Sequence, residues 1–68
     1  MPTEYAIYLR RYTDSGEVQV RYSRWVESRN RIEWMAEHVW NNLTGTDTDV
    51  GSVVVLDRAG NQVWEMEV

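Results

Sequence analysis

A single stretch of this chain has the periodicity of an α-helix, and alternating segments flank it on both sides. The apolar positions of this stretch fall on one helical stripe: Ile32, Met35, Ala36, Val39, Trp40 and Leu43. Ser28 or Asn30 is placed to cap the first turn, and Gly45 is placed to end the helix. We therefore expect one amphipathic helix of about 14 residues.

Each flanking segment contains a turn signal between two β-prone runs. Asp14 and Gly16 bracket the first turn, and Asp57 and Gly60 bracket the second. An Asp that opens a turn, followed by a Gly that tolerates positive φ, is typical of hairpins. We expect four strands, at residues 4–13, 18–26, 52–56 and 62–68. The order ββαββ predicts an α+β fold: a four-stranded antiparallel sheet of two hairpins, with the helix packed on one face.

The length of 68 residues predicts one domain spanning residues 1–68, because a chain this short closes only one core. With 0 Cys there is no disulfide, so the 4 Trp and 4 Tyr or self-association must supply the added stability. No basic leader precedes an apolar run near Met1, and no run approaches the roughly 20 apolar residues of a membrane span. We therefore expect a cytoplasmic protein.

One helix covers one face of the predicted sheet, and the other face must meet water or a partner. The alternation directs six residues toward the helix: Ile7, Leu9, Val18, Val20, Trp64 and Met66. The uncovered face is predicted to carry Tyr8, Arg10, Tyr12, Arg21, Trp25, Val63, Glu65 and Glu67. So many aromatic rings exceed what a solvated face needs, which makes these residues a candidate interaction surface.

The charge distribution favours association of two copies through that face. Residues 1–31 carry a net charge of +2 and residues 32–68 carry −6, which together give the net −4 of the chain. A two-fold interface would set the Arg-rich hairpin of one copy against Glu65 and Glu67 of the other. A different protein partner would use the same face, with Trp34 on the helix as a second anchor. The leading hypothesis is a non-enzymatic, homodimeric protein-interaction module, by analogy with small accessory or inhibitory proteins of bacteria and phages.

A small single-stranded nucleic-acid-binding domain is the alternative interpretation. Arg10 and Arg21 beside Tyr8, Tyr12 and Trp25 combine guanidinium groups for phosphates with rings for base stacking. The sequence pI of about 4.8 opposes this hypothesis, because binders of this kind are usually basic.

Catalytic and metal chemistry find little support in the sequence. There is no Cys, and His38 is the only His. A Ser or Cys nucleophile would therefore find no second imidazole, and no relay of several titrating groups can be built. We expect His38 to pack on the Trp34 ring one turn away. The segment 47–51 resembles the start of a calcium loop, but Arg58 stands where that loop requires Glu. We expect no catalytic residues, no metal, no cofactor and no small-molecule substrate.

Overall fold

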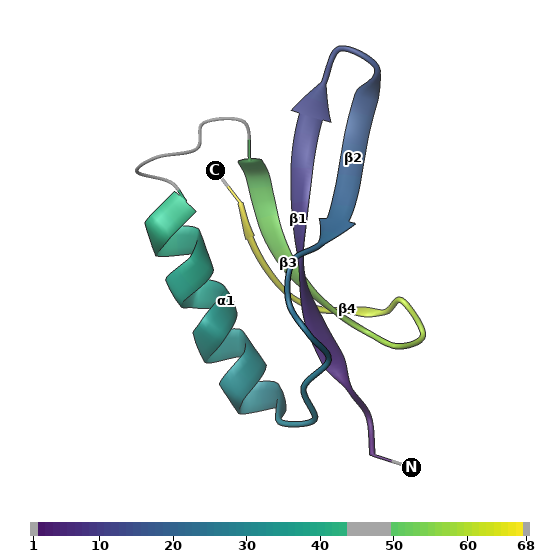
Figure 1. The fold of residues 1–68 in the computed structure, drawn as a ribbon, viewed down its shortest axis with the longest axis vertical. Coiled ribbons are helices and arrows are strands. Elements are labelled where there is room, and N and C mark those ends of the chain that lie inside the picture. Colours follow the sequence, from purple (N-terminus) through teal and green to yellow (C-terminus); the bar gives the residue numbers. More distant parts are fainter. Residues whose placement is uncertain (1, 44–49, 68) are drawn as a thin grey trace.

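The computed structural model describes residues 2–43 and 50–67 and contains four strands and one helix. The elements follow in the order β1 (Tyr5–Thr13), β2 (Gly16–Arg21), α1 (Arg29–Leu43), β3 (Val50–Asp57) and β4 (Gln62–Glu67). All neighbouring strands are antiparallel, and the sheet order is β2-β1-β3-β4 (Figure 1). The predicted α+β fold with the order ββαββ is confirmed, and the two hairpins lie side by side through the pairing of β1 with β3.

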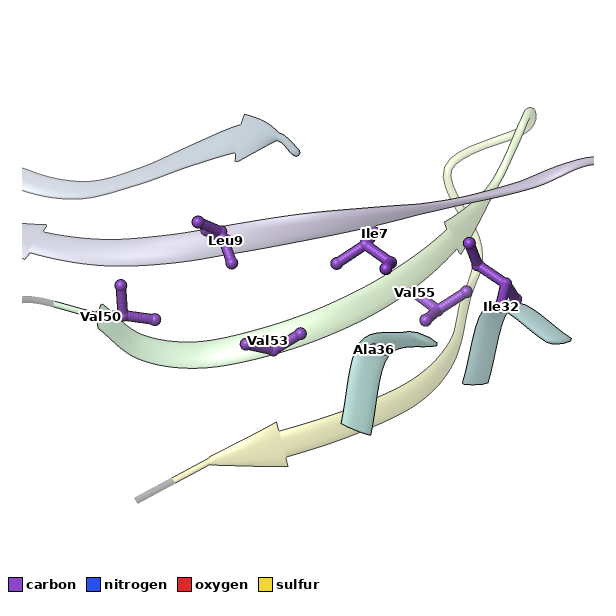
Figure 2. Close-up of a cluster of buried hydrophobic side chains, with 7 residues drawn as sticks. All are labelled: Ile7, Leu9, Ile32, Ala36, Val50, Val53 and Val55. Atoms are coloured by element: carbon purple, nitrogen blue, oxygen red, sulfur yellow. The ribbon is translucent and has the colours of Figure 1, made fainter. Parts of the chain in front are cut away.

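The core lies between α1 and the two central strands. Figure 2 shows the seven buried side chains that form it: Ile7, Leu9, Ile32, Ala36, Val50, Val53 and Val55. Strand β3 has no alternation of buried and exposed residues from Ser52 to Leu56, since every residue there is buried. A central strand covered on both faces explains this continuous apolar run.

Ser28 caps the N-terminus of helix α1 by accepting hydrogen bonds from backbone amides of its first turns. The Ser28 side-chain Oγ accepts a hydrogen bond from the backbone N of Arg31 at 3.2 Å, and the Ser28 carbonyl accepts one from Ile32 N at 3.0 Å. Ser28, and not Asn30, is therefore the capping residue of the two that the sequence offered. The predicted helix stop at Gly45 lies outside the described residues, as do the first three positions of the calcium-loop resemblance.

The return strand of the first hairpin is shorter than predicted, because it ends at Arg21 and not at Val26. Beyond it, the backbone N of Tyr22 and that of Ser23 both donate to the Ile7 carbonyl, at 2.8 and 3.3 Å. The Ser23 hydroxyl accepts the hydrogen bond from Ile7 N at 2.9 Å, in place of a backbone carbonyl. The regular ladder is interrupted here, and only an isolated bridge between Tyr5 and Val26 resumes it.

Both predicted turns form, with Gly16 and Gly60 at positive φ angles of 120° and 87°. In the second turn, Asp57 Oδ1 accepts hydrogen bonds from the backbone N of Ala59 and that of Asn61, both at 2.9 Å. The bond from the Asn61 backbone is the main cause that lowers the pKa of the Asp57 carboxyl, and the Asn61 side chain and the Ala59 backbone act in the same direction.

Candidate functional site

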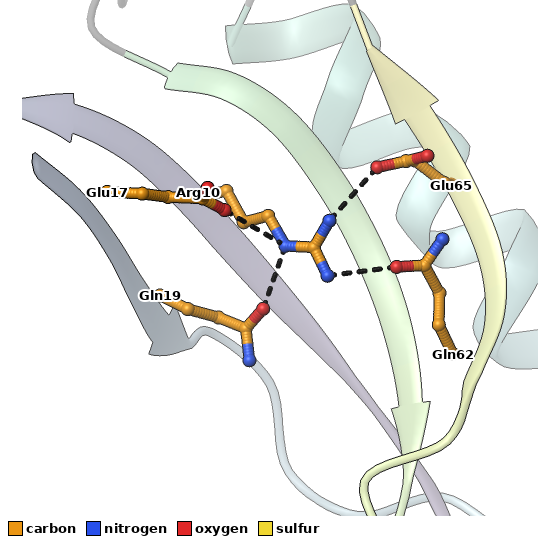
Figure 3. A network of polar contacts seen from close by, with 5 residues as sticks. All are labelled: Arg10, Glu17, Gln19, Gln62 and Glu65. Carbon is orange, nitrogen blue, oxygen red and sulfur yellow. Dashed lines mark hydrogen bonds and ion pairs between the residues drawn. The ribbon is translucent and has the colours of Figure 1, made fainter.

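The sheet face opposite α1 is organised around the side chain of Arg10. Its guanidinium extends across β3 toward β4, where Nη1 lies 3.1 Å from Glu65 Oε2 and Nη2 donates to Gln62 Oε1 at 2.9 Å (Figure 3). Its Nε donates to Gln19 Oε1 at 2.8 Å and lies 3.5 Å from Glu17 Oε1, both on β2. One arginine on β1 therefore links both edge strands of the sheet.

An aromatic and cationic cluster occupies the same face, nearer the N-terminal end of strand β1. The rings of Tyr8 and Trp25 meet edge to face, with centroids 6.4 Å apart. The guanidinium carbons of Arg58 and Arg21 lie 4.2 and 5.6 Å from the centroid of the Trp25 ring. Arg58 also pairs with Glu4, with Nη2 3.2 Å from Oε1. These contacts hold Trp25 against the sheet.

These two groups cover a second layer of buried side chains. Ala6, Ser52, Val54 and Leu56 are buried although they alternate with the residues that face α1. Because the helix lies on the other side of the sheet, the Arg10 network and the Trp25 cluster must shield these four residues. The face predicted to be uncovered is therefore largely closed by the side chains of the chain itself.

Most of the predicted interaction residues do share this face, but their use differs from the hypothesis. Strand register places Tyr8, Arg10, Tyr12, Arg21, Glu65 and Glu67 on it, and the ring contact with Tyr8 places Trp25 there. The pairing of Arg10 with Glu65, expected between two copies, is made within one chain. Whether these residues bind a partner stays a prediction.

The predicted position of Val63 on this face is wrong, because Val63 packs against the core cluster on the helix side. The register between β3 and β4 shifts between Val55 and Leu56, so Val55 opposes Trp64 while Leu56 opposes Gln62. Val63 is the extra residue of this bulge, and such a residue escapes strict alternation.

The outer face of α1 carries Trp34, exposed as expected off the helical stripe. The rings of Trp34 and His38 lie with centroids 4.2 Å apart, which confirms the predicted packing of His38 on Trp34. No other residue predicted for binding lies on the helix, so Trp34 stands apart from the sheet face.

An exposed apolar surface lies along β2 and just beyond its end, on the same side of the sheet as the helix. Val20 opposes Leu9 of the core, but the exposed fractions of Val18, Val20 and Tyr22 are 42, 52 and 56%. The prediction that Val18 and Val20 face the helix side is right in direction, but the helix does not cover them. Helix α1 contacts β1, β3 and β4 but not β2 (Figure 1). We call Val18 and Val20 of β2, together with Tyr22 directly after its end, the β2 apolar strip.

Strand geometry explains why the helix leaves this strip exposed. With strands about 4.8 Å apart, the outer strands of a four-stranded sheet lie about 14 Å from each other. A helix with its side chains is only about 10–12 Å wide. Placed over β3 and its neighbours, α1 cannot also reach β2, and every residue of β2 is exposed. The dimensions alone, applied to the sequence, would have indicated an uncovered edge strand.

The described residues offer little for other kinds of site. Among residues 2–43 and 50–67, no three His, Cys, Asp or Glu side chains gather as a metal site would require. Within the same part of the chain, no helix combines the length and apolar character that crossing a bilayer demands. Comparisons with protein-family models, with curated protein sequences and with solved structures found no match.

Proposed function

We propose that this protein is a non-enzymatic protein-interaction module that binds its partner through strand β2. The observation that carries the proposal is the β2 apolar strip, whose two valines lie on an edge strand that is exposed along its whole length. An edge strand presents unpaired backbone groups that bind an extended segment of another chain by strand addition. Exposed apolar patches on a protein surface often mark sites where a partner binds.

The composition of the chain supports a binding role over a catalytic one. The single imidazole, His38, packs on Trp34, and the chain has 0 Cys. An accessory or inhibitory role, in which a small cytoplasmic protein occupies a surface of a larger macromolecule, is the activity that such a module would perform.

The structure offers less support for the nucleic-acid alternative than for protein binding. The Arg10 guanidinium already contacts Glu65, and Glu17 lies 3.5 Å from its Nε, so its charge is largely balanced within the chain. Trp25 and Tyr8 are both only partly exposed and pack on each other. A base would have to displace these contacts in order to stack on either ring.

The test compares a variant of the strip with a matched control. V18T/V20T keeps the shape and the strand preference of both residues while it adds hydroxyls to the strip. M66T also replaces an apolar side chain by one with a hydroxyl, at an exposed residue of the opposite edge strand. The tagged protein captures a partner from a cell lysate, and the partner is then purified and titrated against wild type and both variants by calorimetry.

We expect V18T/V20T to weaken binding by about tenfold or more and M66T to leave it unchanged. Equal affinity of the wild type and V18T/V20T would contradict the proposal. Tight binding of a labelled single-stranded oligonucleotide, with no protein partner, would favour the alternative function instead.

A further inference from the structure

Strand β2 has a charge and hydrogen-bonding pattern that is complementary to itself. We infer that its partner is a second copy of this chain, paired antiparallel through β2 about a two-fold axis at Gln19. The inference rests on the proposed function, because it names the occupant of the same edge. It would join two four-stranded sheets into one continuous sheet across the dimer.

The backbone of β2 is in the correct phase for this pairing. Antiparallel ladders alternate between residues that bond to one neighbour and residues that point away from it. Tyr22 N donates to the Ile7 carbonyl, so Val20, Val18 and Gly16 are the residues that bond to β1. Glu17, Gln19 and Arg21 therefore direct their backbone N–H and C=O groups away from β1. These are the groups that a second β2 strand would meet.

The side chains select the register centred on Gln19. In that register Glu17 lies opposite the partner's Arg21, and by symmetry Arg21 lies opposite the partner's Glu17. Val18 lies opposite the partner's Val20 in a non-hydrogen-bonded pair, where side chains approach most closely. The pairing thus covers the two valines of the β2 apolar strip.

The surroundings of the Arg21 guanidinium suit it to such a contact. Arg21 makes a cation–π contact with Trp25, and within residues 2–43 and 50–67 no carboxylate forms an ion pair with it. Glu17 is about half exposed beside Arg10, so one side of its carboxylate is open to a second guanidinium.

Other pairings of the same edges are less favourable. Registers centred on Glu17 or on Arg21 place like charges opposite each other. A register centred on Val18 sets Glu17 opposite Gln19, and one centred on Val20 sets Arg21 opposite Gln19, so neither pairs opposite charges. Strand β4 carries two glutamates and no basic residue, so two β4 edges would repel each other. Pairing β2 with β4 would be head to tail and would extend without closing.

The proposed interface is small, so the dimer is expected to be weak. Five paired residues, 17–21, extend over about 17 Å, and the contact falls at the low end of interface sizes. We expect a dimer that forms in the micromolar range or above and weakens with salt, because the charge pairs are exposed. Sedimentation equilibrium over a dilution series is the suitable measurement.

The decisive experiment reverses one charge in each of two samples and then mixes them. E17R opposes two arginines at each end of the interface, and R21E opposes two glutamates, so each variant should dimerise about tenfold more weakly than the wild type. In the equimolar mixture the introduced Arg faces the introduced Glu and the native Arg21 faces the native Glu17. We expect the mixture to dimerise as a heterodimer with near wild-type affinity, and the double variant E17R/R21E to recover likewise.

The controls E37R and R24E make the same charge changes at exposed residues outside β2 and should leave dimerisation unchanged. Circular dichroism shows whether each variant folds. A single variant that does not fold cannot recover on mixing, and in that case the double variant E17R/R21E tests the register by itself. Dimerisation of the wild type, without recovery in a mixture of folded variants or in the folded double variant, would overturn the inference. So would a wild type that stays monomeric at every concentration. In that last case, loss of a captured partner by V18T/V20T would still support β2 as the binding edge for a different protein.

Discussion

The Arg10 network predicts a measurable contribution of one side chain to the stability of the monomer. Arg10 and Glu65 retain side-chain exposures of 24 and 30%, so their ion pair is better shielded than most surface pairs. We assign about 1 kcal/mol to it and about 1 kcal/mol together to the hydrogen bonds with Gln19 and Gln62. Arg10→Ala should therefore destabilise the fold by about 2 kcal/mol. For a chain of 68 residues this lowers the melting temperature by about 14 °C.

The assay is a double-mutant cycle on Arg10→Ala and Glu65→Ala, with urea unfolding followed by tryptophan fluorescence. We expect a coupling free energy of about 1 kcal/mol that does not change with protein concentration, because the pair lies within one chain. Arg10→Lys keeps the charge but loses the several N–H donors of the guanidinium. It should therefore lower the free energy of unfolding by about half as much as Arg10→Ala does. A coupling near zero would refute the network, and a coupling that appears only at high concentration would place the contact between copies.

Three further predictions concern the helix, the core and the second turn. Ser28→Ala should cost about 1 kcal/mol in urea unfolding because it removes the cap of α1, whereas Ser28→Asp should be near neutral. Ile32→Ala, at a fully buried position, should cost about 3 kcal/mol by the same measurement, and a loss below 1 kcal/mol would show that Ile32 is not in the core. The pKa of Asp57 is lowered by folding, so its contribution to stability is complete above the usual pKa near 3.8 and is lost as pH falls through the lowered value. Asp57→Asn should flatten this part of the stability profile in thermal unfolding between pH 5 and pH 2, and an unchanged profile would contradict the turn geometry.

The fold was predictable because each element carries a local signal. The helical stripe from Ile32 to Leu43, the alternation in β1 and the two turns with Gly16 and Gly60 each specify one element without reference to the rest. Four strands and one helix then leave few ways to build a single layered core.

The site was less predictable because it depends on contacts between elements. The alternation rule put Val20 on the helix side, but it does not say how far the helix reaches across the sheet. It also placed Val63 on the wrong face, since a bulge is invisible to a rule of period two. The link from Arg10 to Glu65 joins residues 55 positions apart, and only the strand order β2-β1-β3-β4 brings them together.

The central claim is that strand β2 is the binding edge, and residue-resolved amide hydrogen exchange tests it most directly. We predict that the amides of Glu17, Gln19 and Arg21 exchange rapidly in dilute protein and become protected in concentrated protein or with a purified partner. The amides of Val18 and Val20 should be protected under both conditions, because they bond to β1. Rapid exchange of Glu17, Gln19 and Arg21 in a sample that is demonstrably bound would contradict the account.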